Sequence, residues 1–242
     1  MICPFCKDGV VTPFANTQLN RCGECGLFIN RVFPPYADKL KDTCRNQMLK
    51  ACYDKEKEAS RMADASLQLD VLEENIAPGT IYDVGAAGGF FMKAAQDRGW
   101  KVHGNEISEK AIAWAKEHYG MTIDYGFLEE ISLAECYYDA VVIWNTLEHT
   151  YNPQETLTVS RAMLKQDGLI YIRVPNKKTV EALNKFYERL HLYEFTEECL
   201  SGHLDSLGFQ CVKKWAGRNP RSKIPHCDYL YRKKDILTEE RK

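Results

Sequence analysis

The sequence contains no apolar run that approaches the roughly 18 residues needed to cross a bilayer. Its opening residues, MICPFCKDGV, have neither the basic segment nor the apolar stretch of a secretory signal. We therefore expect no membrane insertion and a cytoplasmic location. The formal net charge at pH 7 is only −2, which excludes the strong overall positive charge that attracts nucleic acids to a whole protein surface.

Internal repeats, low-complexity tracts and the G-x-G-x-x-G loop of dinucleotide-binding domains are also absent from the sequence. The composition is that of an ordinary globular protein, with 45% hydrophobic and 27% charged residues. A chain of 242 residues is long enough for one α/β domain and a small appendage.

Positive charge is concentrated near the end of the sequence. Residues 211–242 contain ten Lys or Arg residues against four Asp or Glu residues. A solvated surface explains such a run, and phosphate contacts to a nucleic acid would explain it as well. We therefore keep nucleic acid as an alternative partner, less favoured than a small molecule.

Four of the ten cysteines form two C-x₂-C pairs, Cys3 with Cys6 and Cys22 with Cys25, separated by fifteen residues. Two such pairs are typical of a tetrahedral zinc site, because each short turn points two thiolates at one ion. Four protein ligands leave no position for water, so the predicted ion is a structural Zn²⁺. A segment of ~35 residues has too little apolar core to fold alone, and zinc would supply the missing stability.

Strand and helix patterns alternate from residue 76 onward. Short apolar runs predict buried parallel strands at 80–84, 101–105, 138–144 and 169–174. Helical patterns occur at 90–97, 109–119, 153–164 and 197–207, with Asn152 and Thr196 as N-caps of the last two. Two further strands are expected near 209–215 and 227–231. This order predicts an α/β fold, a Rossmann-like and mostly parallel sheet with helices on both faces.

The first predicted strand runs into a glycine turn, in the sequence IYDVGAAGGFF at residues 81–91. Ligands of open parallel sheets bind beyond the carboxyl ends of the strands, which puts this turn at the ligand. The carboxylate of Asp83 would repel a pyrophosphate, whereas S-adenosylmethionine brings a sulfonium and an ammonium group that attract it. Glu106 ends the next strand, where a carboxylate can bind ribose hydroxyls in either ligand class. Together the two acids and the irregular turn predict S-adenosylmethionine as the ligand.

Five segments occur along the chain in this order: DVGAAGGFF, VHGNEIS, YYDAVVIWNTLEHTYNP, LKQDGLIYIRVPN and HLYEFTEECLSGHLDSLGF. In that order the sequence resembles the class I S-adenosylmethionine-dependent methyltransferases, in particular the small-molecule branch that includes quinone O-methyltransferases. The resemblance covers residues 76–209, and a four-cysteine ribbon before such a domain extends it to most of the chain. It implies a seven-stranded sheet with an antiparallel last strand, for which 227–231 would serve, inserted at the edge.

The resemblance also implies a set of donor-binding residues at the strand ends: Asp83, Gly85, Ala87, Gly89, Glu106, Ile107, Phe127, Leu128 and Asn145. The residues of the glycine turn would line the methionine part, and Glu106 with Ile107 the ribose and adenine. Phe127 stands where the family often has an aspartate, so backbone groups there would serve the adenine edge. Asn145, at the end of the fourth strand, would lie under the sulfonium.

Methyl transfer to a hydroxyl requires in-line alignment and, in addition, a base or a metal. His149, in NTLEHTYNP, is the predicted base or positioning group, with Glu148 beside it. In the quinone O-methyltransferases a Glu-x-x-Glu-His cluster at this place can bind a divalent metal, but here Asn145 replaces the first Glu. His191 is predicted to enter the acceptor pocket from the other side. The alternatives are that Glu148 and His149 only shape the loop, and that His191 lies on the surface.

The sequence thus predicts a zinc ribbon at 1–35, a helical connector or lid at 36–75 that includes Tyr36 and Tyr53, an S-adenosylmethionine-binding methyltransferase domain at 76–232, and a basic tail at 233–242. The predicted reaction is methyl transfer to a small molecule, most simply to a hydroxyl. Two alternatives stay open: an RNA methyltransferase that uses the ribbon and the basic stretch to bind its substrate, and a non-catalytic ribbon module.

Overall fold

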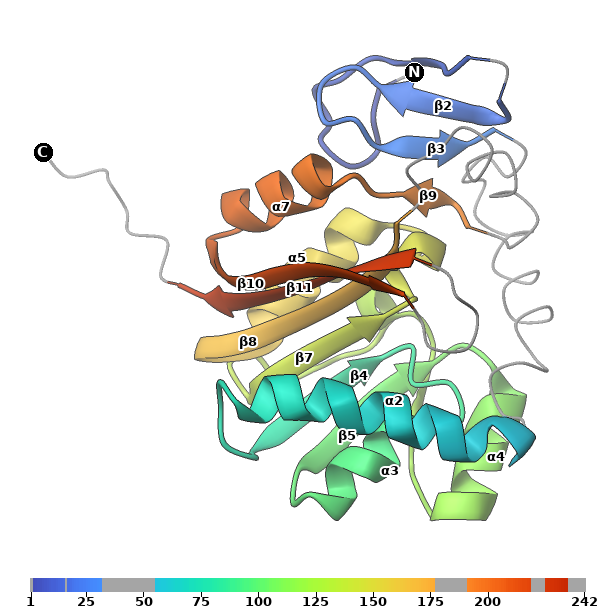
Figure 1. Ribbon diagram of the computed structural model, residues 1–242, viewed down its shortest axis with the longest axis vertical. Helices are drawn as coiled ribbons and strands as arrows, with labels where there is room; N and C mark the ends of the chain where they lie inside the picture. Colours follow the sequence, from blue (N-terminus) through green and yellow to red (C-terminus); the bar gives the residue numbers. More distant parts are fainter. Residues whose placement is uncertain (1, 16, 32–54, 177–190, 219–224, 235–242) are drawn as a thin grey trace, which may run out of the picture.

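The computed structural model of the protein describes residues 2–15, 17–31, 55–176, 191–218 and 225–234. Tyr36, Tyr53 and residues 36–54 of the predicted connector lie outside these residues, as do residues 235–242 of the predicted basic tail. Figure 1 shows a large sheet flanked by helices, with a small sheet beside it that is formed mainly by the first part of the chain.

The large sheet has seven strands in the order β10-β11-β8-β7-β4-β5-β6. All strands run parallel except β11, which is antiparallel to both of its neighbours. This confirms the predicted Rossmann-like α/β fold. The strands are β4 (Thr80–Val84), β5 (Lys101–Glu106), β6 (Asp124–Tyr125), β7 (Tyr138–Trp144), β8 (Leu164–Pro175), β10 (Phe209–Arg218) and β11 (Pro225–Lys233).

One part of the predicted topology is wrong. The antiparallel strand, β11, does not lie at the edge of the sheet but between β10 and β8, and β10 takes the edge. The residues explain this order. Tyr229, Leu230 and Tyr231 of β11 are almost completely buried and need neighbours on both sides. Lys213 and Lys214 of β10 are exposed, and lysines are typical of edge strands.

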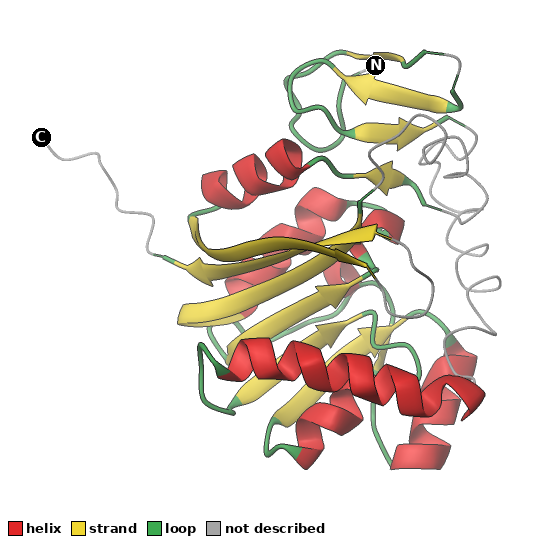
Figure 2. Cartoon of the chain, viewed as in Figure 1, coloured by secondary structure: helices red, strands yellow, loops and turns green. Residues whose placement is uncertain are grey.

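Helices cover both faces of the large sheet, as predicted (Figure 2). On one face lie α2 (Lys55–Glu73) and α3 (Phe90–Asp97), with α4 (Glu109–Tyr119) beside α3; on the other lie α5 (Pro153–Met163) and α7 (Glu197–Ser206). The predicted N-caps are confirmed, since Asn152 and Thr196 accept the backbone N–H of Glu155 and Cys199. Among the described residues, no helix combines the length and the apolar content that crossing a membrane requires.

The small sheet contains a strand that the sequence analysis did not predict. Its order is β1 (Val11–Pro13), β2 (Leu19–Cys22), β3 (Phe28–Asn30) and β9 (Tyr193–Glu194). The fourth strand comes from the segment just before α7, some 160 residues along the chain. Phe5 is completely buried between this segment and α7, with its ring centroid 5.4 Å from that of Phe195 and 4.2 Å from that of His203. The ribbon and the large domain therefore share one apolar core.

A buried ionic network links α2 to the large sheet near the carboxyl end of β8. Arg173 Nε donates to Asp228 Oδ1 at 2.8 Å, and Arg173 Nη1 lies 3.2 Å from Asp64 Oδ1 on α2. His226 Nε2 lies 3.0 Å from the other oxygen of Asp228, which is fully buried. Buried ions of this kind contribute little net stability as a pair, but removal of one partner leaves the other without compensation.

We predict that Arg173→Met lowers the free energy of unfolding by about 3–5 kcal/mol, because the buried carboxylate of Asp228 loses its guanidinium. Urea denaturation of the full chain measures this. The matched control is Lys165→Met, which removes an exposed partner from Asp139 and should cost less than about 1 kcal/mol. Equal small losses for both variants would show that the network is not energetically coupled.

Candidate functional site

The turn after β4 is held in a conformation that few side chains permit. Gly85, Ala87 and Gly89 all have positive φ, at 76°, 49° and 73°. A Cβ atom at Gly85 would lie only 2.5 Å from Oγ1 of Thr146, in the segment after β7. The missing side chain therefore allows the segments after β4 and β7 to meet, which forms the floor of a site at the carboxyl edge of the sheet.

Asp83 lies at this edge with only 5% of its surface exposed. Burial and the nearby charge of Glu106 raise the pKa of Asp83 to about 8. An ammonium or sulfonium group placed beside this carboxyl would favour its ionised form, whereas a phosphate would not. The electrostatics of the edge therefore suit a cationic ligand.

Glu106, at the end of β5, is the anchor of two loops. One carboxylate oxygen accepts the N–H of Ala87 at 2.8 Å, and the other accepts the N–H groups of Ile107 and Ser108 at 2.8 and 2.9 Å. Burial raises the pKa of Glu106, while these hydrogen bonds act in the opposite direction. A carboxylate offers about four acceptor positions, so ribose hydroxyls can still bind to it.

The segment predicted to face the adenine is fixed against β5. The side chain of Asn105 donates to the carbonyl of Gly126 at 2.9 Å, and Gly126 N–H donates to the carbonyl of Glu106 at 3.1 Å. Phe127 and Leu128, which open the short helix η1 (Leu128–Glu130), have 7% and 2% of their surface exposed. Their side chains thus fill the core, and their backbone lies along the edge of the site.

Asn145 occupies the first position after β7, exposed and with a φ of 50°. Asparagine is one of the few residues other than glycine that adopt this left-handed conformation readily. Its backbone N–H donates to the carbonyl of Arg173 at 2.9 Å, so the end of β7 is tied to β8 directly beside the buried ionic network.

Three titratable side chains, Glu148, His149 and His191, meet just beyond this point. Their ligand atoms all lie within 4.8 Å of one another, close enough to share one cation. Glu148 and His149 belong to the short helix η2 (Leu147–His149), and His191 lies two residues before the first residue of β9. His149 Nε2 is 3.9 Å from Glu148 Oε1, and the two imidazole centroids are 4.7 Å apart. Glu148 and His191 are buried, and the His149 side chain is 15% exposed, which makes it the accessible member.

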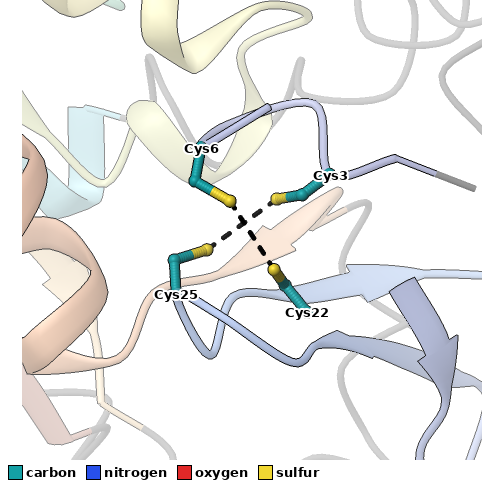
Figure 3. Close-up of side chains that lie close together, drawn as sticks. All are labelled: Cys3, Cys6, Cys22 and Cys25. Carbon is teal, nitrogen blue, oxygen red and sulfur yellow. Dashed lines mark hydrogen bonds between the residues drawn. The ribbon is translucent and has the colours of Figure 1, made fainter. Parts of the chain in front are cut away.

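The four ribbon cysteines converge on one point (Figure 3). The sulfur of Cys3 lies 3.8 Å from that of Cys25, and the sulfur of Cys6 lies 3.7 Å from that of Cys22. A tetrahedral ion with metal–sulfur bonds of ~2.3 Å separates its sulfurs by about 3.8 Å. The cysteines therefore fit the geometry of a four-thiolate zinc site.

The structure thus combines a mostly parallel sheet with a glycine turn and two buried carboxylates at the carboxyl edge of that sheet. A family model described as a methyltransferase domain matches residues 55–233. The chain therefore belongs to this methyltransferase family, in agreement with the predicted class of S-adenosylmethionine-dependent methyltransferases. Among curated relatives, it is 30% identical to a ubiquinone biosynthesis O-methyltransferase of Dechloromonas aromatica over 119 residues, 46% of this chain and 51% of the relative. The chain thus spans about half the length of the curated relatives it matches.

Solved structures agree on the fold. A 1,6-didemethyltoxoflavin-N1-methyltransferase of Burkholderia thailandensis, with bound 1,6-didemethyltoxoflavin and S-adenosylhomocysteine, has a TM-score of 0.63 at 19% identity and covers 93% of this chain and 100% of its own. A methyltransferase of Archaeoglobus fulgidus has a TM-score of 0.61 at 19% identity, covering 72% of this chain and 94% of its own.

Sequence reasoning missed Thr146, which packs against the glycine turn, and Asn105, which fixes the adenine segment. It also did not predict that His191 lies against His149. No signal in the sequence singles out Asn105, because four of the six residues of β5, KVHGNE, are polar. No local signal distinguishes Thr146, because its partner is sixty residues away.

We predict that Asp83→Asn stabilises the protein above pH 8 while weakening binding of S-adenosylmethionine by about 10- to 100-fold. The sign follows from linkage: the folded-state pKa is raised, so the wild type loses stability as pH rises from about 4 to about 8, and the variant does not. Thermal unfolding from pH 4 to 9 and calorimetric titration of the donor measure both effects. Asp205→Asn, at an exposed position on α7, is the control and should change neither. A variant that is less stable at every pH would contradict the prediction.

Proposed function

We propose that the protein transfers a methyl group from S-adenosylmethionine to a hydroxyl of a small molecule, with His149 as general base. The cluster of Glu148, His149 and His191 carries this proposal, because it places an accessible imidazole next to the segment that meets the glycine turn. Two comparisons support a small-molecule acceptor. The curated relatives are named ubiquinone biosynthesis O-methyltransferases, and one structural neighbour is named a 1,6-didemethyltoxoflavin-N1-methyltransferase.

Donor binding uses the strand ends. In this proposal the carboxylate of Asp83 holds the ammonium group, directly or through water, and Glu106 binds the ribose hydroxyls. The turn of Gly85, Ala87 and Gly89 faces the methionine part. Ile107 and the backbone at Phe127 and Leu128 flank the ribose and adenine, and Asn145 lies under the sulfonium. The raised pKa of Asp83 supports this arrangement, because the bound cation relieves the cost of its ionisation.

The chemistry then needs one proton transfer. His149 removes the proton from the acceptor hydroxyl as the oxygen forms its bond to the methyl carbon, the carbon–sulfur bond breaks, and S-adenosylhomocysteine leaves. Glu148 stabilises the imidazolium that forms, since its carboxylate lies 3.9 Å from His149 Nε2 in a buried environment. His191 lies edge-on to the same ring and fixes its orientation.

His149→Ala is expected to lower the rate of methyl transfer by about 10²- to 10⁴-fold, because the acceptor loses its base. Affinity for S-adenosylhomocysteine should not change. The assay transfers radiolabelled methyl from S-adenosylmethionine into a cell extract that is then separated into metabolite, RNA and protein pools. We expect label in the metabolite pool. His118→Ala, on the exposed surface of α4, is the control. Label in RNA, or unchanged transfer by His149→Ala, would each refute part of the proposal.

We also propose that Cys3, Cys6, Cys22 and Cys25 hold a structural Zn²⁺. The sulfur separations support this, and four thiolates leave no open position for chemistry.

Cys6→Ser should therefore reduce the bound zinc from about one ion per chain to almost none, and lower the melting temperature, because ion binding contributes to folding. Atomic absorption and thermal unfolding measure the two quantities. Cys136→Ser, at an exposed cysteine outside the ribbon, should leave both unchanged. A full complement of zinc in Cys6→Ser would rule out this site.

A further inference from the structure

The ribbon contacts the large domain at the cluster of Glu148, His149 and His191. Strand β3 pairs with β9 in antiparallel register, Phe28 with Glu194 and Ile29 with Tyr193. His191 lies two residues before Tyr193. The last strand of the ribbon and the segment that carries the second histidine are therefore parts of one sheet (Figure 1).

Three hydrogen bonds continue from the ribbon into the cluster. The side chain of Asn30 donates to the carbonyl of His191 at 3.0 Å, and its backbone N–H donates to the carbonyl of Leu192 at 2.9 Å. Leu192 N–H donates in turn to the carbonyl of Glu148 at 2.8 Å. Asn30 is 1% exposed. Asn30 of the ribbon thus fixes the backbone of His191, and Leu192 fixes the backbone of Glu148.

The zinc end of the ribbon is anchored to the same region. Cys25 packs against the apolar cluster that contains Cys199, on the first turn of α7. Tyr193, in β9, donates from its hydroxyl to the carbonyl of Tyr151, two residues after His149. Cys3, Phe5, Cys22, Leu27 and Ile29 share one apolar cluster with Leu192 and Tyr193. The ribbon cannot shift as a unit without moving the segment 191–195.

From these contacts we infer that the ribbon is a wall of the acceptor site, and that Asn30 is a positioning residue for His191 and Glu148. The inference rests on the proposed function, since it assigns the ribbon a part in orienting the base. The donor side is held mainly by other contacts: hydrogen bonds among β5 and the segments after β4 and β5 fix the glycine turn and Glu106, and Thr146 joins this turn to the segment that leads into the cluster. Loss of the Asn30 amide therefore affects acceptor chemistry and leaves donor binding intact.

The test uses the full zinc-loaded chain and three substitutions. Asn30→Leu keeps the size of the side chain but removes the donor, and Asn30→Gln keeps an amide. Asn20→Leu is the matched control, at a half-exposed asparagine on the neighbouring strand β2. Four quantities are measured: zinc content by atomic absorption, affinity for S-adenosylhomocysteine by calorimetry, the Cε1–Hε1 resonances of His149 and His191 by NMR, and methyl transfer into the metabolite pool.

We expect Asn30→Leu to move both histidine resonances and to reduce transfer by about 10- to 100-fold, with zinc content and S-adenosylhomocysteine affinity unchanged. Asn30→Gln should retain more transfer than Asn30→Leu, and Asn20→Leu should resemble the wild type. Unchanged resonances in Asn30→Leu, or loss of S-adenosylhomocysteine binding in that variant, would overturn the inference. Resonances that move although the wild type methylates no metabolite would refute the proposed function and leave the coupling between ribbon and cluster intact.

Discussion

The ligand side of the fold depends on the burial of two carboxylates, Asp83 and Glu106, at the edge where the parallel strands end. Glu106 accepts three backbone N–H groups and so determines how the turns after β4 and β5 approach each other. Asp83 is left in an environment where its ionisation is costly, with a pKa raised to about 8. Two carboxylates buried this close together are stabilised when a cation binds beside them. This requirement favours a sulfonium donor over a pyrophosphate.

The proposed acceptor side is assembled in a different way. The two histidines of the cluster come from two segments of the large domain, and one of these segments leads into a strand that pairs with the ribbon. Pairing with β9 also covers what would otherwise be an exposed edge of β3, and Phe5 is buried in the same contact. The edge of the ribbon sheet formed by β3 therefore faces the large domain and is already paired. This arrangement favours an internal role for the ribbon over the reading of a nucleic acid.

The features that could be predicted from sequence are those with short-range causes. The order IYDVGAAGG contains the strand, the turn and Asp83 within nine residues, and each C-x₂-C pair places its thiols by local geometry. The position of β11 and the pairing of β9 have long-range causes. A two-residue strand has no periodicity to detect, and the segment that brings His191 to His149 leads into a strand whose partner, β3, lies more than 160 residues earlier in the chain. The order of β10 and β11 in the sheet depends on which of the two strands is apolar on both faces. The spacing of the strands along the sequence does not reveal this.

The division between a locally built donor site and an acceptor site built at long range has a physical consequence. Changes in Asn30, Tyr193 or the core around Phe5 can move His191 by small amounts without touching Asp83, Glu106 or the glycine turn. Under the proposed function, the donor would be held mainly by contacts within the large domain. The position of the base relative to the acceptor would then be set by packing between ribbon and domain. A zinc site that cannot do chemistry itself would in this way limit which hydroxyl the neighbouring imidazole can reach.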